Sequence, residues 1–306
     1  IITNDQTSEI VQIIDHLGKV KKEFTKSGKP IGAVVLSDIN NDGDTNIIIG
    51  TNVFSYEIGL LYTTEFSRTP IAFDVNGDNQ QEILSASGLY AADGVKLWQY
   101  GTPGSFWFSA IANLDDDVDP EIVISNPNEG VLSVLEHNGN IKWQVRNTAY
   151  TGGGPQAISN FLGSNDIGIV HAGYTVVDMY NKNGDLVWSV PNDDELSGKI
   201  GVSAYDFNGD GIDEVIVQDH LTVRVLNGID GAILSTVANS SATLWEYPIV
   251  VDLEGDNDAE LIVVSNNYDK RWDINNGVTV YGAADKSKPW KNATRIWNQH
   301  SYHQTN

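Results

Sequence analysis

A nine-residue pattern that recurs five times constrains this chain more than any other feature. In Asp206-Phe-Asn-Gly-Asp-Gly-Ile-Asp-Glu214, oxygen-bearing side chains stand at positions 1, 3, 5 and 9. Gly211, at position 6, allows a left-handed backbone without a Cβ clash, and apolar runs on either side predict a strand before and after the loop. A hard dication such as calcium takes about 6–8 oxygen ligands, and side chains two residues apart in a tight turn can converge on one centre. The pattern therefore predicts a calcium loop between two strands, not a helix–loop–helix EF-hand.

The four other copies keep the same register, and each is followed by a strand-like apolar run. Isolated acidic turns are common and most of them bind nothing, but chance does not produce five copies in one register. We expect ligands from positions 1, 3, 5, 7 and 9, with a backbone carbonyl at position 7, and hence about five calcium ions. The predicted ligands are Asp38, Asn40, Asp42, Asp44 and Asn46; Asp74, Asn76, Asp78, Gln80 and Glu82; Asn113, Asp115, Asp117, Asp119 and Glu121; Asp206, Asn208, Asp210, Ile212 and Glu214; and Asp252, Glu254, Asp256, Asp258 and Glu260.

The third loop is expected to bind calcium most weakly. Val118 stands at position 6, where the other copies have Gly or Asn. A β-branched side chain is strained in a left-handed backbone, so we expect a distorted site there.

The charge of the chain is concentrated in these loops. Nearly half of the 41 acidic residues lie in the five nonapeptides, which contain no Lys or Arg, and the formal net charge is −23. No basic stripe is present that would neutralise phosphates, so nucleic acid is excluded as an expected partner. The absence of cysteine excludes a disulfide framework and a thiolate site.

The calcium loops also predict a compartment. Extracellular calcium modules bind with Kd values of about 10⁻⁴–10⁻³ M, which cytosolic calcium would not satisfy. We therefore expect an extracellular or cell-surface location. No stretch reaches the ~18 apolar residues of a membrane helix, which predicts no membrane insertion. The chain starts at Ile1 without a signal peptide, so we expect it to be part of a larger secreted or surface protein.

Two periodic patterns organise the chain. The widest gap between loops spans two periods, and residues 157–170 fill it with a repeat that has lost its ligands, with Leu162, Ser164 and Gly168 at positions 3, 5 and 9. A second pattern, Asx-Gly followed four residues later by Trp, predicts hairpins whose tryptophans pack between neighbouring sheets, with ligand stacking as an open alternative. The residues four after the glycine are Trp98, Trp143, Trp188 and, in a weaker fourth copy, Ser235.

Four strands in each repeat predict an all-β, seven-bladed β-propeller with the calcium loops between the first and second strands of the blades. The chain is expected to be one domain, 1–306, with blades at approximately 31–68, 69–105, 106–153, 154–198, 199–244 and 245–290. Residues 1–30 and 291–306 are expected to form the seventh blade together, so that N- and C-terminal strands close the ring and remove its free edges.

The five Asx-x-Asx/Glu-x-Asp loops and the blade periodicity resemble the integrin α-subunit propeller and its bacterial secreted relatives with FG-GAP or VCBS repeats. The Phe-Gly and Gly-Ala-Pro tags of integrins are not evident, so the bacterial branch fits better. The ending Trp297-Asn-Gln-His-Ser-Tyr-His303 is similar to segments that close such arrays. The resemblance implies a calcium-rigidified adhesion or recognition platform.

We expect function on the face opposite the calcium loops, as an extracellular module that binds a glycan or a protein. Exposed aromatic side chains and Arg are common anchors of recognition surfaces. The candidate ligand-binding residues are Tyr268, Arg271, Trp272, Trp107, Tyr150 and Trp245.

No catalytic residue is predicted, because the chain has no cysteine, no Gly-x-Ser-x-Gly elbow and no patterned histidines. Some related calcium propellers are polysaccharide lyases, so an enzyme of that type is the alternative. A quinone-cofactor propeller is a third reading, prompted by the Gly-x-x-x-Trp series, and it leaves the calcium loops without a purpose.

Overall fold

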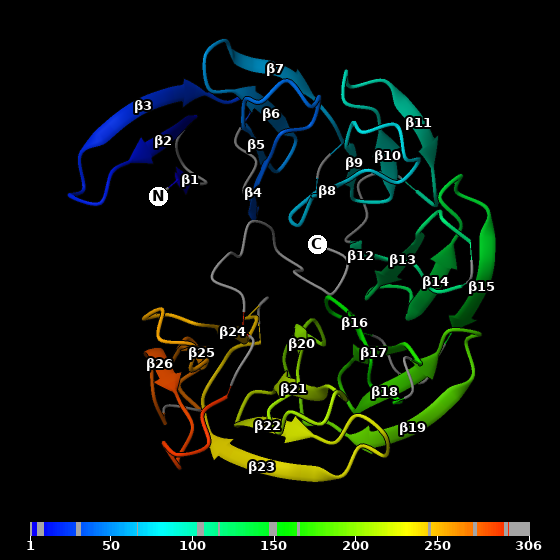
Figure 1. Ribbon diagram of the computed structural model, residues 1–306, viewed down its shortest axis with the longest axis vertical. Helices are drawn as coiled ribbons and strands as arrows, with labels where there is room; N and C mark the ends of the chain where they lie inside the picture. Colours follow the sequence, from blue (N-terminus) through cyan, green and yellow to red (C-terminus); the bar gives the residue numbers. More distant parts are fainter. Residues whose placement is uncertain are drawn as a thin grey trace.

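In the computed structural model, all regular structure is β. The structure describes residues 2–4, 9–28, 32–65, 67–102, 107–115, 117–146, 152–163, 166–243, 246–271, 274–290 and 293. Over these ranges the chain forms 26 strands in seven antiparallel sheets and no helix, and hence no helix that is long and apolar enough to cross a bilayer. Figure 1 shows the sheets following one another in chain order around a common centre.

Each sheet is built from strands that are consecutive in the sequence. The first sheet contains β1 (Ile2–Asn4), β2 (Ile10–Ile14) and β3 (Val20–Thr25), and the second contains β4 (Val34–Ser37), β5 (Asn46–Ile49), β6 (Asn52–Ser55) and β7 (Gly59–Thr63). The third contains β8 (Ile71–Phe73), β9 (Glu82–Ser85), β10 (Gly88–Tyr90) and β11 (Lys96–Gln99), and the fourth β12 (Phe108–Ala112), β13 (Glu121–Asn126), β14 (Val131–Leu135) and β15 (Ile141–Arg146). The fifth contains β16 (Ala157–Ser159), β17 (Gly168–Ala172), β18 (Val176–Asn181) and β19 (Leu186–Pro191), and the sixth β20 (Val202–Tyr205), β21 (Glu214–Gln218), β22 (Thr222–Leu226) and β23 (Ile233–Ala238). The seventh contains β24 (Ile249–Val251), β25 (Glu260–Ser265) and β26 (Gly277–Tyr281).

The core lies between sheets. Strands β13 and β14 are buried along their whole length, because both of their faces meet a neighbouring sheet, whereas no residue of the outer strand β15 is fully buried. One apolar cluster joins Val123 and Val134 of the fourth sheet to Ile158, Ile169 and Tyr180 of the fifth. Clusters of the same kind join the other consecutive sheets. This arrangement is that of a propeller, in which each sheet is stabilised by the next.

A repeated side-chain contact, called here the latch, fastens the outer strands β7, β11, β15 and β19 to the hairpin of the next sheet. In three copies a tryptophan indole donates Nε1–H to a backbone carbonyl of that hairpin. The pairs are Trp98 with His137 at 2.9 Å, Trp143 with Lys182 at 2.8 Å and Trp188 with Gly228 at 2.7 Å. Tyr62 does the same through its hydroxyl group to Ala92, at 2.8 Å. The prediction that these tryptophans pack between sheets is confirmed.

The hairpin glycine makes the latch possible. Gly184 has a φ of 85°, and a Cβ built on it would lie 2.8 Å from the Trp143 ring. Gly139 faces Trp98 in the same way. The glycine is therefore needed twice, once for its backbone conformation and once for the space that the ring of the preceding sheet occupies.

The repeat without ligands near residue 160 is confirmed as a structural repeat, because β16 and β17 flank it. The sixth repeat differs from the expectation of four strands. Residues 282–290 after β26 form turns, and the carboxylate of Asp258 accepts the Trp290 N–H at 3.0 Å. Residues 291–292 and 294–306, which are expected to complete the seventh blade, lie outside the described residues.

Candidate functional site

The five predicted calcium loops occupy equivalent places. Each joins the first strand of a sheet to the second, so they share one face, called here the calcium-loop face. Position 9 is in every case the first residue of the second strand, and these side chains are at most 6% exposed. They are Asn46, Glu82, Glu121, Glu214 and Glu260.

The side chain at position 1 organises the loop backbone. Both carboxylate oxygens of Asp206 accept hydrogen bonds from the backbone N–H groups of Gly209, Asp210 and Gly211, at 2.6, 3.2 and 2.8 Å. Gly209 and Gly211 have φ values of 76° and 84°, which turns these N–H groups inward. Asp74 accepts the equivalent three hydrogen bonds in the second loop. Two loops separated by more than a hundred residues thus fold alike.

Position 9 supplies a buried carboxylate. In Glu214, Oε2 accepts the Phe207 N–H at 2.8 Å and Oε1 accepts Nδ2–H of Asn208 at 2.9 Å. The pKa of Glu214 is raised to about 7, mainly by burial and also by the charges of Asp206 and Asp210, while the hydrogen bond from the Phe207 N–H acts in the opposite direction. Burial also raises the pKa of Glu82. A cation at the loop centre would offset this repulsion, so the donor set suits a hard dication.

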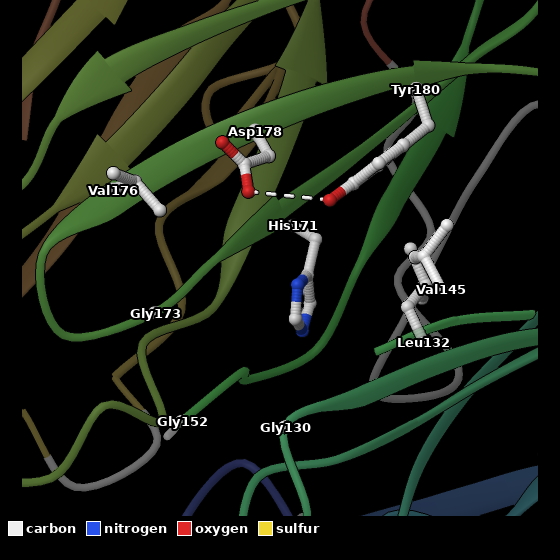
Figure 2. Close-up of a pocket in the computed structure, with 9 residues that line it drawn as sticks. All are labelled: Gly130, Leu132, Val145, Gly152, His171, Gly173, Val176, Asp178 and Tyr180. Carbon is white, nitrogen blue, oxygen red and sulfur yellow. Dashed lines mark hydrogen bonds between the residues drawn. The ribbon is translucent and has the colours of Figure 1, made fainter. Parts of the chain in front are cut away.

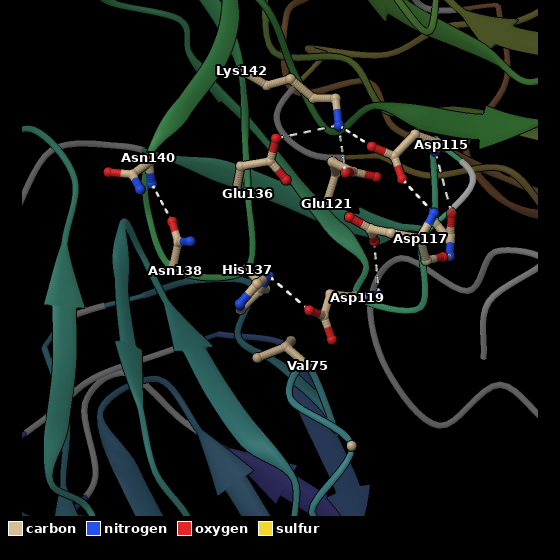
Figure 3. A network of polar contacts seen from close by, with 12 residues as sticks. Val75, Asp115, Asp117, Asp119, Glu121, Glu136, His137, Asn138, Asn140 and Lys142 are labelled. Carbon is tan, nitrogen blue, oxygen red and sulfur yellow. Dashed lines mark hydrogen bonds and ion pairs between the residues drawn. The ribbon is translucent and has the colours of Figure 1, made fainter.

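The third loop already contains a cation from its own sheet (Figure 3). The ammonium group of Lys142 contacts the carboxylate of Asp115, and it lies 2.8 Å from Oε1 of Glu121 and 3.2 Å from Oε1 of Glu136. Asp115, Asp117 and Glu121 bring their oxygens within 4.8 Å of one another. The contact with Lys142 lowers the pKa of Asp115. Lys142 therefore competes directly with a metal ion for two of the predicted ligands.

The expected strain at Val118 is not observed. Val118 is 92% exposed and does not adopt a positive φ, whereas Asn79 and Asn257, at the same position of other loops, do. The third loop takes another backbone path, in which Nδ2–H of Asn113 donates to the Asp117 carbonyl at 2.6 Å. The physical reason given for a weak third site was wrong, and Lys142 supplies a different one.

In two further loops, side chains make contacts with other parts of the chain. Lys286 lies 3.1 Å from Asp258 Oδ2, and Asp258 Oδ1 accepts the Trp290 N–H at 3.0 Å, so both side-chain oxygens at position 7 of the fifth loop already have partners. In the repeat without ligands, Nδ2–H of Asn160 donates to the Gly211 carbonyl at 2.5 Å. That loop therefore supports the neighbouring calcium loop.

The opposite face carries a platform made of the loops that follow β19, β23 and β25. The carboxylate of Asp194, 2% exposed, accepts the hydroxyl hydrogen of Thr243 at 2.6 Å and joins the first two loops. The Asn266 N–H donates to the Ser240 carbonyl at 2.9 Å and joins the last two. Tyr268, in the loop after β25, is 82% exposed. The three loops thus form one surface that displays an aromatic ring.

Arg271 bridges the platform. Its guanidinium group lies 2.8 Å from Asp269 of its own loop and 3.7 Å from Glu195 of the loop after β19. These contacts raise the pKa of Arg271, the Asp269 hydrogen bond most of all. The structure therefore brings two predicted ligand-binding residues, Tyr268 and Arg271, to one exposed surface.

The other predicted ligand-binding residues are placed differently. Trp107 is 5% exposed and packs edge-on against Tyr100 with ring centroids 5.5 Å apart, so its side chain belongs to the core. Tyr150, Trp245 and Trp272 lie outside the described residues.

Sequence reasoning missed a mixed group on the platform. Asp193, Glu195 and the buried His220 place ligand-type atoms within 4.8 Å of one another. A His with two carboxylates suits a transition metal, although Arg271 already pairs with Glu195. The blade periodicity could have indicated this group, because it places the loop after β19, with Asp193 and Glu195, and the turn after β21, with His220, on the same face.

A small pocket between the fourth and fifth sheets contains His171 (Figure 2). Its volume of about 20 Å³ has room for a single water molecule. Asp178 accepts the Tyr180 hydroxyl hydrogen at 3.3 Å beside it. Burial lowers the pKa of His171 to about 4, so the imidazole is neutral at physiological pH. The pocket is therefore part of the packing between sheets, not a ligand site.

No family model and no curated protein sequence matches this chain. Among solved structures, the crystal structure of the V. cholerae biofilm matrix protein Bap1 matches with a TM-score of 0.93 and 33% identity, over 98% of this chain and 77% of that chain. The chain belongs to the same family as this biofilm matrix protein. BBS1N, solved in complex with ARL6DN and soaked with lead, matches with a TM-score of 0.56 and 14% identity, over 87% of this chain and 84% of that chain. That likeness shows the fold alone, a β-propeller.

Proposed function

We propose that this chain is a calcium-stabilised extracellular binding module for adhesion, which recognises a glycan or protein ligand through the face opposite the calcium loops. The observation that carries the proposal is the 33% identity with a biofilm matrix protein over 98% of the chain. A matrix protein works outside the cell, where calcium is abundant enough for loops of this kind. The seven-bladed closure and the FG-GAP type of repeat belong to the same proposal.

The loop geometry supports calcium as the ion. Carboxylate, amide and carbonyl oxygens are the ligands that calcium prefers, and the hydrogen bonds of Asp206 and Asp74 hold the loops in shape. Among the described ion pairs, Lys142 contacts two predicted acidic ligands of the third loop, whereas Lys286 contacts only the side chain of Asp258 in the fifth loop, at position 7, where the backbone carbonyl is the expected ligand. We therefore expect four calcium ions to bind well, the third site to bind weakly, and none to bind at 160–168.

The platform supports a recognition role. Loops on a rigid scaffold are the usual place for binding residues, and an exposed Tyr beside an Arg offers both apolar contact and charged hydrogen bonds. Tyr268 and Arg271 combine these features on a surface supported by buried polar contacts. Trp272, next in the sequence, belongs to the same proposed site.

The test is a binding assay in calcium with a glycan array and with immobilised bacterial cells. The double variant Tyr268→Ala/Arg271→Ala, and the same variant with Trp272→Ala, should lose binding at an unchanged melting temperature. The matched control is Ile58→Ala/Lys288→Ala, which removes one exposed apolar side chain from the turn between β6 and β7 and one exposed cation from the turns after β26. Equal loss in both double variants would contradict the placement. Release of unsaturated sugar from an acidic polysaccharide would indicate a lyase instead.

A further inference from the structure

The sixth sheet lacks the aromatic latch. Ser235 of β23 pairs with Val225, just as Trp188 of β19 pairs with Met179 and Trp143 of β15 pairs with Val134. Ser235 thus stands at the latch position, and its side chain is too short to reach the next sheet. At the three preceding interfaces an indole fills this space and donates a hydrogen bond.

A cavity of about 450 Å³ lies between the sixth and seventh sheets at this place. Its volume is within the range of small-ligand sites, about 300–1,000 Å³. Most of the wall is apolar, and Ser235 itself lies at the cavity. The residues that form the apolar wall include Val225, Val237, Leu261, Tyr281 and Trp290.

The acceptor for a bound ring can be identified from the repeat. In three latches the accepting carbonyl lies in the next sheet, three residues after the residue that pairs with that sheet's own latch position. His137, Lys182 and Gly228 follow Val134, Met179 and Val225 in this way, and these three pair with Trp143, Trp188 and Ser235. In the seventh sheet the residue equivalent to Val134 is Val280. Val134 pairs with Val123, which stands two residues after Glu121, the first residue of β13. Val280 likewise pairs with Ile262, which stands two residues after Glu260, the first residue of β25. The corresponding acceptor is therefore the carbonyl of Ala283, between the cavity residues Gly282 and Ala284.

We propose that this cavity binds an aromatic ring that carries an N–H or O–H donor, such as an indole or a phenol. The ring would take the place that tryptophan occupies at the preceding interfaces and would donate to Ala283. The shared chemistry allows two sources, a free aromatic molecule or a Trp or Tyr side chain of another polypeptide. The inference does not depend on the identity of the glycan or protein ligand proposed for the opposite face.

The experiment is calorimetric titration of the whole chain with indole, in calcium. Ser235→Trp supplies the missing ring from the chain itself, so it should lower the indole affinity by about tenfold or more. Ser235→Ala keeps the cavity open and should bind as the wild type does. Thr236→Trp, on the adjacent exposed residue that does not line the cavity, adds the same indole elsewhere and should also bind normally.

Wild-type protein that fails to bind indole at millimolar concentration, or Ser235→Trp that binds it as well as the wild type, would overturn the proposal. A crystal structure of the wild type with indole tests it without any variant: a ring between β23 and β26 supports it, and a ring only elsewhere overturns it. N-acetyltryptophanamide distinguishes the sources. If it binds as indole does, the site accepts a side chain on a polypeptide; if only indole binds, the site takes free small molecules.

Discussion

The latch can be tested with two hairpin glycines that have similar backbone conformations but different neighbours. Gly184 and Gly18 stand in hairpins with the same backbone hydrogen bond, from the Gly N–H to the residue three before it, at 3.0 Å in both. Their φ values are 85° and 78°. A Cβ on Gly184 would lie 2.8 Å from the Trp143 ring, whereas a Cβ on Gly18 meets nothing within 4 Å. Gly184→Ala and Gly18→Ala are therefore a matched pair.

The expected costs follow from these two environments. An L-residue in the left-handed region costs about 1–2 kcal/mol, which is the whole cost at Gly18. At Gly184 the new methyl also pushes the indole away from contact distance and weakens the 2.8 Å hydrogen bond from Trp143 to Lys182. Overpacking of this kind costs about 1–3 kcal/mol more. We expect Gly184→Ala to destabilise the protein by about 2–5 kcal/mol and Gly18→Ala by about 1–2 kcal/mol.

The assay is urea unfolding followed by far-UV circular dichroism in saturating calcium, which does not depend on tryptophan fluorescence. A double-mutant cycle isolates the contact: in the Trp143→Ala background, Gly184→Ala should cost no more than Gly18→Ala does in the wild type. The coupling energy between the two sites should be about 1–3 kcal/mol. Equal costs for the two glycine variants, or a Gly184→Ala cost that persists without the indole, would refute the latch as an energetic contact.

Three other predictions concern calcium, lysine and histidine. Chelation of calcium should lower the melting temperature by about ten degrees or more, and Asp210→Ala should lower it by about 5 °C, because each site contributes about 2.7 kcal/mol at a hundredfold excess of calcium over Kd. Scanning calorimetry with and without chelator measures both effects. An unchanged midpoint would mean that the loops bind no metal. Lys142→Met should raise the calcium affinity of the third site by about tenfold, because it frees Asp115 and Glu121. Calorimetric titration with calcium measures this affinity, and an affinity equal to that of the wild type would contradict the prediction. His171 has a folded-state pKa of about 4, below its unfolded value, so its contribution is present above about pH 6.5 and is lost as the pH falls toward 4. Between pH 7 and 5 the free energy of unfolding of the wild type should fall by about 2 kcal/mol more than that of His171→Gln, as measured by urea unfolding at each pH. An equal fall in the two proteins would contradict the prediction.

The repeat architecture was predictable because its signals are local. An Asx-x-Asx-x-Asp loop before an apolar run needs only nine residues, and the hairpin glycine and its tryptophan lie four residues apart. Such patterns fix where the strands start, which is why Glu82 and Glu214 open their strands as expected. The packing of Trp143 between sheets followed from the same reasoning, since a large apolar ring on an outer strand has a neighbouring sheet as its only dry surface.

What sequence reasoning missed depends on residues that are distant in the chain. Lys142 enters the third loop from 21 residues beyond Glu121, and an outer-strand lysine looks like any solvated charge. Trp107 lies in a connection but is covered by Tyr100, so its position in a loop did not make it exposed. The importance of Ser235 emerges only from strand register, because a serine in a weak repeat carries no signal of the cavity beside it.

The two faces of the propeller are stabilised by different means, and this difference favours the platform as the place of recognition. The predicted calcium loops and the latch hairpins both open on the calcium-loop face, so the proposed metal ligands and packed rings occupy its surface. The opposite face is held by capping hydrogen bonds of buried polar groups such as Asp194 and Ser240, which fix the loops from below and leave their tips in solvent. A ligand that bound the calcium-loop face would have to compete with groups already committed to the fold. A ligand at Tyr268 and Arg271 meets side chains whose support lies beneath them, so these can change without loss of the fold.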